Sequence, residues 1–180
     1  MTNVKNSLES FSLYCGTYAK YNNSNLFGAW LNLSDYSDYI ELMKAMRELH
    51  NDEDAPEFHF QDYECRDFFI NQNLIGESFL SNEIYKIAEK LDISTHDFEV
   101  IEAFGDCFGQ NNDIDELLEK VSENYYGCYN SDEDFAENLL CDMGEIPQNL
   151  PSYIYIDYVR TARDLMFDFS SSNNHYFRNY

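Results

Sequence analysis

The first third of the chain combines strand-like alternation of apolar residues with one helix-like stretch. Residues 12–19 (SLYCGTYA) and 27–33 (FGAWLNL) are typical of strands, and the second places an apolar side chain at every other position. The polar residues 20–25 between them predict a loop, and residues 58–64 predict a third strand. With a helix before the third strand, the pattern predicts a ββαβ unit that follows a polar, mobile lead-in.

The helix of this unit is expected to end near His50, with Ser34 or Ser37 as its N-cap. Its apolar face is expected to contain Tyr36, Ile40, Met43 and either Met46 or Arg47.

After residue 64 the apolar period becomes helical. Residues 65–76 are irregular, and Leu80, Ile84 and Leu91 then mark one amphipathic helix. A second helix is expected to be capped by Thr95 and to reach Phe108.

The last third carries three helix N-terminal signals. Asp113 and Ser131 each precede an apolar-periodic segment, and Asp157 precedes a third that ends at Leu165. Gly144 suits the position just after a helix, residues 125–129 could pair as a strand, and the tail is expected to add an edge strand.

These elements predict an α+β protein made of three small domains. Residues 1–64 would form an N-terminal ββαβ domain, residues 65–108 a helical middle domain, and residues 109–180 an α+β C-terminal domain. A length of 180 residues with 44% apolar content is sufficient for one to three small cores.

The chain is strongly acidic. It contains 34 Asp or Glu and only 11 Lys or Arg, which gives a formal net charge of −23. This is several times what solubility requires. Such a field repels nucleic acids and anionic membranes, and it attracts basic proteins or cations. Adaptation to high salt is the simpler explanation, but the 15 Tyr and 14 Phe fit poorly with a surface that only binds water.

The acidic residues concentrate between residues 92 and 157, where Lys120 is the one base. Phe and Leu residues recur at helical spacing among them, which indicates folded helices rather than a disordered acidic tail. The expected anionic recognition surface comprises Asp92, Asp97, Glu99, Glu102, Asp106, Asp113, Asp115, Glu116, Glu119, Glu123, Asp132, Glu133, Asp134, Glu137, Asp142 and Glu145.

The sequence favours no catalytic residue, metal site or cofactor. With so many carboxylates, close pairs arise by chance, so a hydrolase is not indicated. The run 130–134 begins like a calcium loop but lacks its central Gly and closing Glu, and a helix N-terminus is favoured. The four His are scattered and expected near the surface, and no glycine-rich nucleotide motif occurs.

Cysteine usage and hydropathy point to a cytoplasmic protein. The five Cys are odd in number and form no CxxC pair, so reduced and mostly buried thiols are expected. No apolar run follows Lys5, which predicts no signal peptide, and no stretch approaches the length of a membrane helix.

Three groups of segments together resemble the ArdA family of antirestriction proteins. The first is GTYAKYN at 16–22 followed by Gly28-Ala29-Trp30, and the second is PEF at 56–58 leading into QDYE at 61–64. The third runs from Glu145-Ile146-Pro147 through YIDY to ARDL, and its last part comprises Tyr155, Ile156, Asp157, Tyr158, Ala162, Arg163, Asp164 and Leu165. The similarity spans residues 13 to about 175.

The resemblance implies that the three domains form an elongated chain. It also implies a dimeric, non-enzymatic protein that mimics B-form DNA and occupies the DNA-binding groove of Type I restriction-modification enzymes. The acidic side chains would take the place of phosphates, and the family segment up to Leu165 would fix the C-terminal fold or an interface, with Arg163 paired to a carboxylate. An alternative needs charge but no DNA-like geometry: an acidic, chaperone-like partner of basic nucleoid or other DNA-binding proteins.

Overall fold

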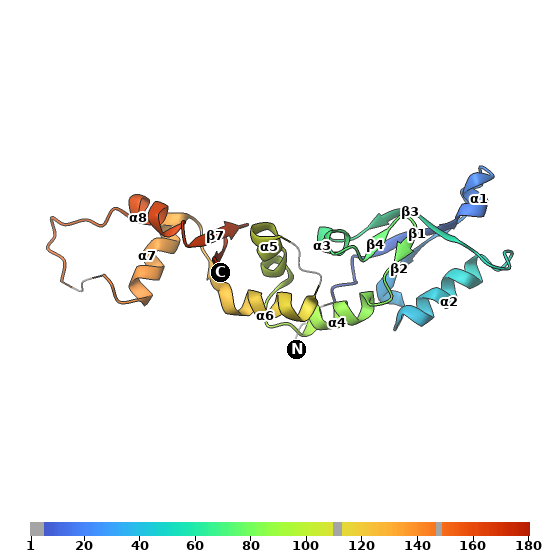
Figure 1. Ribbon diagram of the computed structural model, residues 1–180, viewed down its shortest axis with the longest axis horizontal. Helices are drawn as coiled ribbons and strands as arrows, with labels where there is room; N and C mark the ends of the chain where they lie inside the picture. Colours follow the sequence, from blue (N-terminus) through green and yellow to red (C-terminus); the bar gives the residue numbers. More distant parts are fainter. Residues whose placement is uncertain (1–5, 110–112, 147–148) are drawn as a thin grey trace. The chain divides into compact units, whose positions relative to one another are not determined.

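The computed structural model describes residues 6–109, 113–146 and 149–180. Contacts between residues divide the chain into two compact units, Met1–Thr95 and His96–Tyr180, which we call the N-terminal and C-terminal units. Both combine helices with antiparallel strands, so the predicted α+β class is confirmed (Figure 1). The division into three domains stays a prediction. Pro147 of the family segment lies outside the described residues.

The N-terminal unit contains a three-stranded sheet, a two-stranded ladder and five helical segments among its described residues. In chain order they are β1 (Ser12–Thr17), α1 (Tyr18–Asn22), β2 (Ala29–Asn32), the 3-10 helix η1 (Leu33–Asp35), α2 (Tyr39–Leu49), β3 (Phe58–Glu64), α3 (Asp67–Asn71), β4 (Ile75–Gly76), β5 (Phe79–Leu80) and α4 (Ile84–Ile93).

The three-stranded sheet has the order β2-β1-β3, with both pairs antiparallel. The predicted third strand is confirmed. β1, however, ends two residues before the expected position, because the Thr17 side chain accepts a hydrogen bond from the Lys20 backbone N–H and caps α1. A short helix therefore replaces the first part of the predicted loop.

Of the apolar face predicted for helix α2, only Met46 is buried. Asp38, rather than Ser34 or Ser37, is its N-cap, and its side chain accepts from the Glu41 N–H at 2.8 Å. Leu42 and Met46 are fully buried, whereas Ile40 is 79% exposed. The helix carries two apolar stripes, and the sheet packs against the one that contains Leu42.

The start of the chain is attached to α4 and is not a free lead-in from Ser7 onward. The Ser7 N–H donates to Asp92 Oδ1 at 2.8 Å, and its hydroxyl donates to the Ala88 carbonyl at 3.3 Å. Leu8 is buried beside this contact. Helix α4 itself buries Ile84 and Leu91, as the periodicity predicts.

The C-terminal unit contains four helices and one three-stranded sheet among its described residues. In chain order they are α5 (Phe98–Phe108), α6 (Ile114–Asn124), β6 (Tyr125–Cys128), α7 (Asp132–Asp142), α8 (Tyr158–Leu165), β7 (Phe169–Ser172) and β8 (His175–Arg178).

The N-caps of the last three helices are confirmed. Asp113 accepts from the backbone N–H of Asp115 and Glu116, Ser131 from Asp134, and Asp157 from Arg160. These bonds satisfy amide groups that the first turn of a helix leaves unpaired. Before α5 the N-cap is Asp97 and not the expected Thr95.

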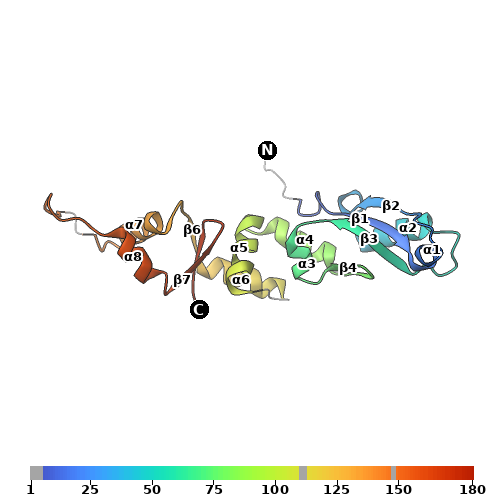
Figure 2. The same cartoon turned by 90° about the horizontal axis from the view of Figure 1, so that it is seen from above.

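The sheet of this unit has the order β6-β8-β7, so the last strand is central and β6 and β7 are the two edges. Asn173 and Asn174 join β7 to β8 with positive φ of 49° and 67°, the conformation of a tight hairpin turn. The sheet and α7 enclose a core of Phe135, Leu139, Phe169 and Tyr176, with Tyr129, Leu165 and Met166 packed against it. Helices α7 and α8 lie side by side (Figure 2).

Candidate functional site

The acidic residues singled out from the sequence lie at or near the surface. Of the sixteen, thirteen are exposed, and Asp92, Glu102 and Asp134 are half-buried. All except Asp92 belong to the C-terminal unit, which carries eighteen acids and four bases against sixteen and seven in the N-terminal unit. We call these fifteen residues of the C-terminal unit the acidic surface.

Helices α6 and α7 carry the densest charge. Eleven residues of α-helix span about 16 Å, and one strand of B-form DNA places about five phosphates along that length. Helix α7 holds five carboxylates and no base, while α6 holds four in addition to its N-cap Asp113. Each helix therefore has a linear charge density close to that of one DNA strand.

Some of these acids also hold the fold together. Asp132 accepts a 2.6 Å hydrogen bond from the buried Tyr176 hydroxyl, and Asp106 accepts from Ser172 at 2.9 Å. Asp134 accepts from the Asn130 N–H at 3.1 Å and from the Asn138 amide at 3.1 Å. Replacing these acids would therefore alter both charge and structure.

Two pKa shifts follow from this architecture. Hydrogen bonds from its own backbone N–H and from Ser131 lower the pKa of Glu133, so its charge is favoured at the start of α7. That contribution is present above the unfolded-state pKa and is lost as the pH falls through the lowered folded-state value. Burial and the hydrogen bond to Asp132 raise the pKa of Tyr176 well above its usual range, so the phenol stays neutral.

Lys120, the base among the acidic helices, is paired within its own helix. Its ammonium lies 2.7 Å from Glu116 Oε1 and 5.1 Å from the centre of the Tyr180 ring. The hydrogen bond that Lys120 donates to Glu116 raises the pKa of Lys120, so the lysine stays charged and offsets one carboxylate. The rest of α6 remains anionic.

The family segment near α8 divides into packed and exposed residues. Ala162 is 2% exposed, and Leu165 packs against the core of the unit. Asp157 caps the helix, while Ile156 and Tyr158 are half-buried. The remaining residues, Tyr155, Arg163 and Asp164, are exposed.

The expected ion pair of Arg163 is absent within 4.0 Å among the described residues. Helix neighbours lie three and four positions away, and at those distances Arg163 has only Val159, Arg160, Met166 and Phe167. It instead lines a groove of about 580 Å³ with Val159 and Phe167, which are 66% and 78% exposed. The spacing of four residues from Val159 to Arg163 and from Arg163 to Phe167 is visible in the sequence, but the outward direction of these side chains is not.

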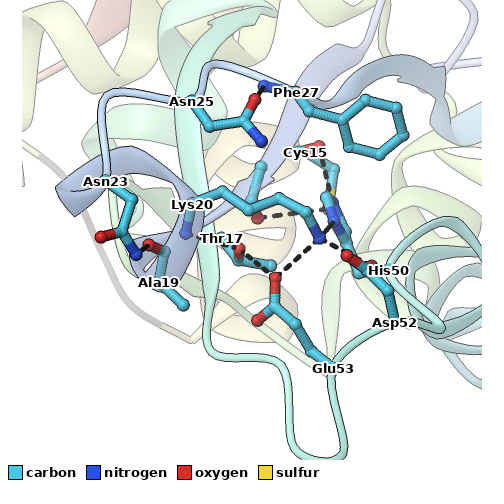
Figure 3. A network of polar contacts seen from close by, with 11 residues as sticks. Cys15, Thr17, Ala19, Lys20, Asn23, Asn25, Phe27, His50, Asp52 and Glu53 are labelled. Atoms are coloured by element: carbon cyan, nitrogen blue, oxygen red, sulfur yellow. Dashed lines mark hydrogen bonds and ion pairs between the residues drawn. The ribbon is translucent and has the colours of Figure 1, made fainter.

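The only group of three His, Cys, Asp or Glu side chains in the described residues that could hold a metal ion is His50, Asp52 and Glu53. Lys20 already occupies its centre (Figure 3). Its Nζ lies 3.1 Å from His50 Nδ1, 2.8 Å from Asp52 Oδ1 and 2.7 Å from Glu53 Oε1. The ammonium can only donate, so His50 Nδ1 accepts and its Nε2–H donates to the Cys15 carbonyl at 3.2 Å. The group is therefore an internal ion-pair network that links β1, α1 and the end of α2.

We expect Lys20→Met to lower the melting temperature of the N-terminal unit by about 4–8 °C, because a loss of about 1 kcal/mol shifts the melting temperature of a domain of this size by that amount. Hydrogen bonds from Lys20 and Thr17 lower the pKa of Glu53, so this stability is present above the unfolded-state pKa and is lost as the pH falls through the folded-state value. Thermal melts at neutral and acidic pH measure both effects. Lys44→Met is the control, because Lys44 is 75% exposed and 3.7 Å from Glu48. Stabilisation of the wild-type protein by Zn²⁺ or Ca²⁺ would contradict the assignment.

Two expectations about titratable side chains are wrong. His50 and His59 are buried, at 0% and 3% exposure, because each packs among aromatic rings beside the sheet. Of the five thiols only Cys15 is buried, and burial raises its pKa to about 12. All five are free, and Cys128 and Cys141 are exposed. No helix of the described residues has the length and apolar character needed to cross a membrane.

Comparison with known proteins agrees with the sequence resemblance. A comparison with curated proteins found no match. The family model described as antirestriction protein (ArdA), in contrast, matches residues 13–178, which is nearly the whole chain and includes both units. The chain therefore belongs to the ArdA family of antirestriction proteins.

Proposed function

We propose that this antirestriction protein acts as a mimic of B-form DNA and blocks the DNA-binding groove of Type I restriction-modification enzymes. The observation that carries the proposal is the acidic surface: fifteen carboxylates of one unit, twelve of them within helices α5, α6 and α7, at a density on α6 and α7 close to that of a DNA strand. Family membership supplies the antirestriction role.

The proposed mechanism is binding without catalysis. A DNA-binding groove presents Lys and Arg to phosphates, and these bases contribute most of the sequence-independent affinity. Carboxylates held on rigid helices can meet the same bases without the ordering cost of a flexible acidic tail. In this proposal the protein works in the cytoplasm, binds no nucleic acid and needs no cofactor.

Competition with duplex DNA tests the proposal directly. A Type I enzyme is bound to a labelled duplex, and the protein is added at low and moderate salt. We expect displacement of the duplex that weakens as salt rises, because both partners are held by many charge contacts. Simultaneous binding of protein and duplex to the enzyme would contradict the proposal.

The alternative, a chaperone-like partner of basic proteins, would be favoured by a different outcome. A generic basic protein with a net charge similar to that of the restriction enzyme should then bind this protein as tightly as the enzyme does, because only the total charge matters. Mimicry predicts a clear preference for the enzyme.

We further propose that the protein is a homodimer and that the groove on α8 forms its interface. Val159 and Phe167 are large, exposed apolar side chains, and Arg160 and Arg163 lie beside them in the more acidic unit. In a symmetric dimer, two such faces would bury their apolar residues, and each arginine would meet exposed carboxylates of the other copy.

Arg163→Ala should therefore loosen dimerisation by roughly tenfold or more, because arginines at interface centres contribute strongly to affinity. Its effect on the stability of the monomer should be small, since the side chain is exposed. Sedimentation across a concentration series measures the dimer constant, and Arg178→Ala, an exposed arginine on β8, is the control. Unchanged association together with lost inhibition would instead place Arg163 in contact with the enzyme.

A further inference from the structure

A second exposed surface lies on the three-stranded sheet of the N-terminal unit. Tyr14 of β1 is opposite Trp30 of β2 and opposite Asp62 of β3, so these three side chains share one face. Two residues along, Ser12 is opposite Asn32 and Glu64 on the same face. We call these six residues the outer sheet face.

The other face of this sheet is the one that packs. Leu13 and Cys15, which alternate with Ser12 and Tyr14, are fully buried, and Phe60 is 4% exposed. Figure 1 shows α2 and α4 on one side of the strands, and in Figure 2 the strands lie in front of α2. On the outer sheet face, by contrast, Trp30 is 47% exposed, and Asp62 and Glu64 are exposed.

The two aromatic rings of this face are held in place. The Tyr14 hydroxyl donates to the Leu26 carbonyl at 3.0 Å, and its ring meets Trp30 edge-on at 5.8 Å between centroids. Gly28 makes this possible, because a Cβ there would come within 2.8 Å of the Tyr14 ring and 2.4 Å of the Cys15 carbonyl oxygen. A glycine of the family segment thus permits a preformed aromatic pair.

The charged side chains of the outer sheet face are all acidic. Strands β1, β2 and β3 contain no Lys or Arg, while Asp62 and Glu64 project from β3. Adjacent strands are about 4.8 Å apart, and Asp62 is the residue of β3 directly opposite Tyr14. An aromatic surface beside carboxylates is complementary to a planar cation.

We propose that the outer sheet face binds arginine side chains presented by the partner protein. A guanidinium can stack on Trp30 or Tyr14 and at the same time donate two hydrogen bonds to Asp62. A lysine ammonium has no planar face to stack and no paired donors for one carboxylate. This inference rests on the proposed function in one respect, the identity of the protein that presents the arginine. The fit to a guanidinium depends only on the residues of the outer sheet face.

Trp30 provides a local probe, because it is the only tryptophan of the chain. Its fluorescence is followed while the full-length protein is titrated with a Trp-free peptide of alternating Gly and Arg, and separately with the same peptide carrying Lys. We expect a saturable change with both peptides and a dissociation constant about two- to fivefold lower for the arginine peptide.

The double variant Asp62→Asn with Glu64→Gln should raise the dissociation constant of the arginine peptide at least about threefold. The matched control is Glu48→Gln with Glu89→Gln, which removes the same charge from α2 and α4. All four positions are exposed, and melting curves verify that the variants fold. Equal responses of the two double variants, or no difference between arginine and lysine, would overturn the inference.

The same variants separate this inference from the proposed function. If the wild-type protein displaces duplex DNA but the peptide leaves Trp30 fluorescence unchanged, the inference fails and mimicry stands. If the peptide binds as expected but no duplex is displaced, mimicry fails and guanidinium binding by the face stands. If both hold, the Asp62 and Glu64 double variant should also weaken displacement more than its control.

Discussion

Replacing Glu99, Glu119, Glu123 and Asp142 together by their amides should weaken binding to a Type I enzyme by a factor between about five and several hundred. Each exposed charge contact contributes roughly 1.5- to fivefold in affinity. The free energies of contacts that are spread over a groove are approximately additive, so the fold-changes multiply. Single replacements should therefore cost a few-fold at most, and the loss should grow with each further site.

These four sites are chosen because the structure gives their side chains no packing role. The run from Asp132 to Glu137 is a less suitable target, since Asp132 holds the buried Tyr176 hydroxyl and Asp134 fixes the start of α7. Amide replacement at the chosen sites leaves side-chain size nearly unchanged. Stability should be equal or slightly higher, because like-charge repulsion falls.

The control removes the same charge from the N-terminal unit: Glu48, Asp54, Glu57 and Glu89, all exposed. Displacement of duplex DNA is measured for both quadruple variants at two salt concentrations. Mimicry predicts a much larger loss for the first set. Equal losses would mean that net charge alone matters and would favour the chaperone-like alternative, and one site that accounts for the whole effect would indicate a discrete ligand site.

Elements with strong local signals could be predicted from the sequence. The strand 58–64 coincides with β3, because its composition and its flanking breaks both favour a strand. Asp113, Ser131 and Asp157 are N-caps as predicted, since each side chain meets an amide only two or three residues away. The solvent exposure of the acids follows from the cost of burying a charge.

Features that depend on tertiary contacts could not be predicted in the same way. Both stripes of α2 are apolar, and only the sheet decides that Leu42 is buried and Ile40 exposed. His50 is buried because Lys20 and the Cys15 carbonyl, distant in sequence, satisfy both of its ring nitrogens. The sequence predicts an edge strand in the tail, but the central position of β8 depends on its pairing with β6. The outer sheet face likewise needs the strand register.

Phe135→Ala should destabilise the C-terminal unit by about 3–5 kcal/mol, the usual cost of removing a buried Phe side chain and leaving a cavity. Phe135 is fully buried, and its ring stacks on Tyr176 at 4.5 Å and contacts Phe169 and Tyr129 at 5.0 and 5.3 Å. A loss of this size is a large part of the stability of a small domain. Denaturant unfolding followed by circular dichroism measures it. Tyr153→Ala is the control, because Tyr153 is an aromatic residue of the same unit that is 78% exposed.

The same substitution tests whether the acidic surface must be ordered. Phe135→Ala leaves the formal charge at −23 and removes no carboxylate, but it takes away the side chain that anchors α7 to the sheet. If the enzyme recognises a fixed array of charges, displacement of duplex DNA should fall in parallel with the population of the folded C-terminal unit, and lowering the temperature should restore both. If the enzyme responds only to total charge, the variant should displace DNA as well as the wild-type protein does even where the unit is unfolded. That result would remove the geometric part of the proposal and leave an acidic partner of basic proteins.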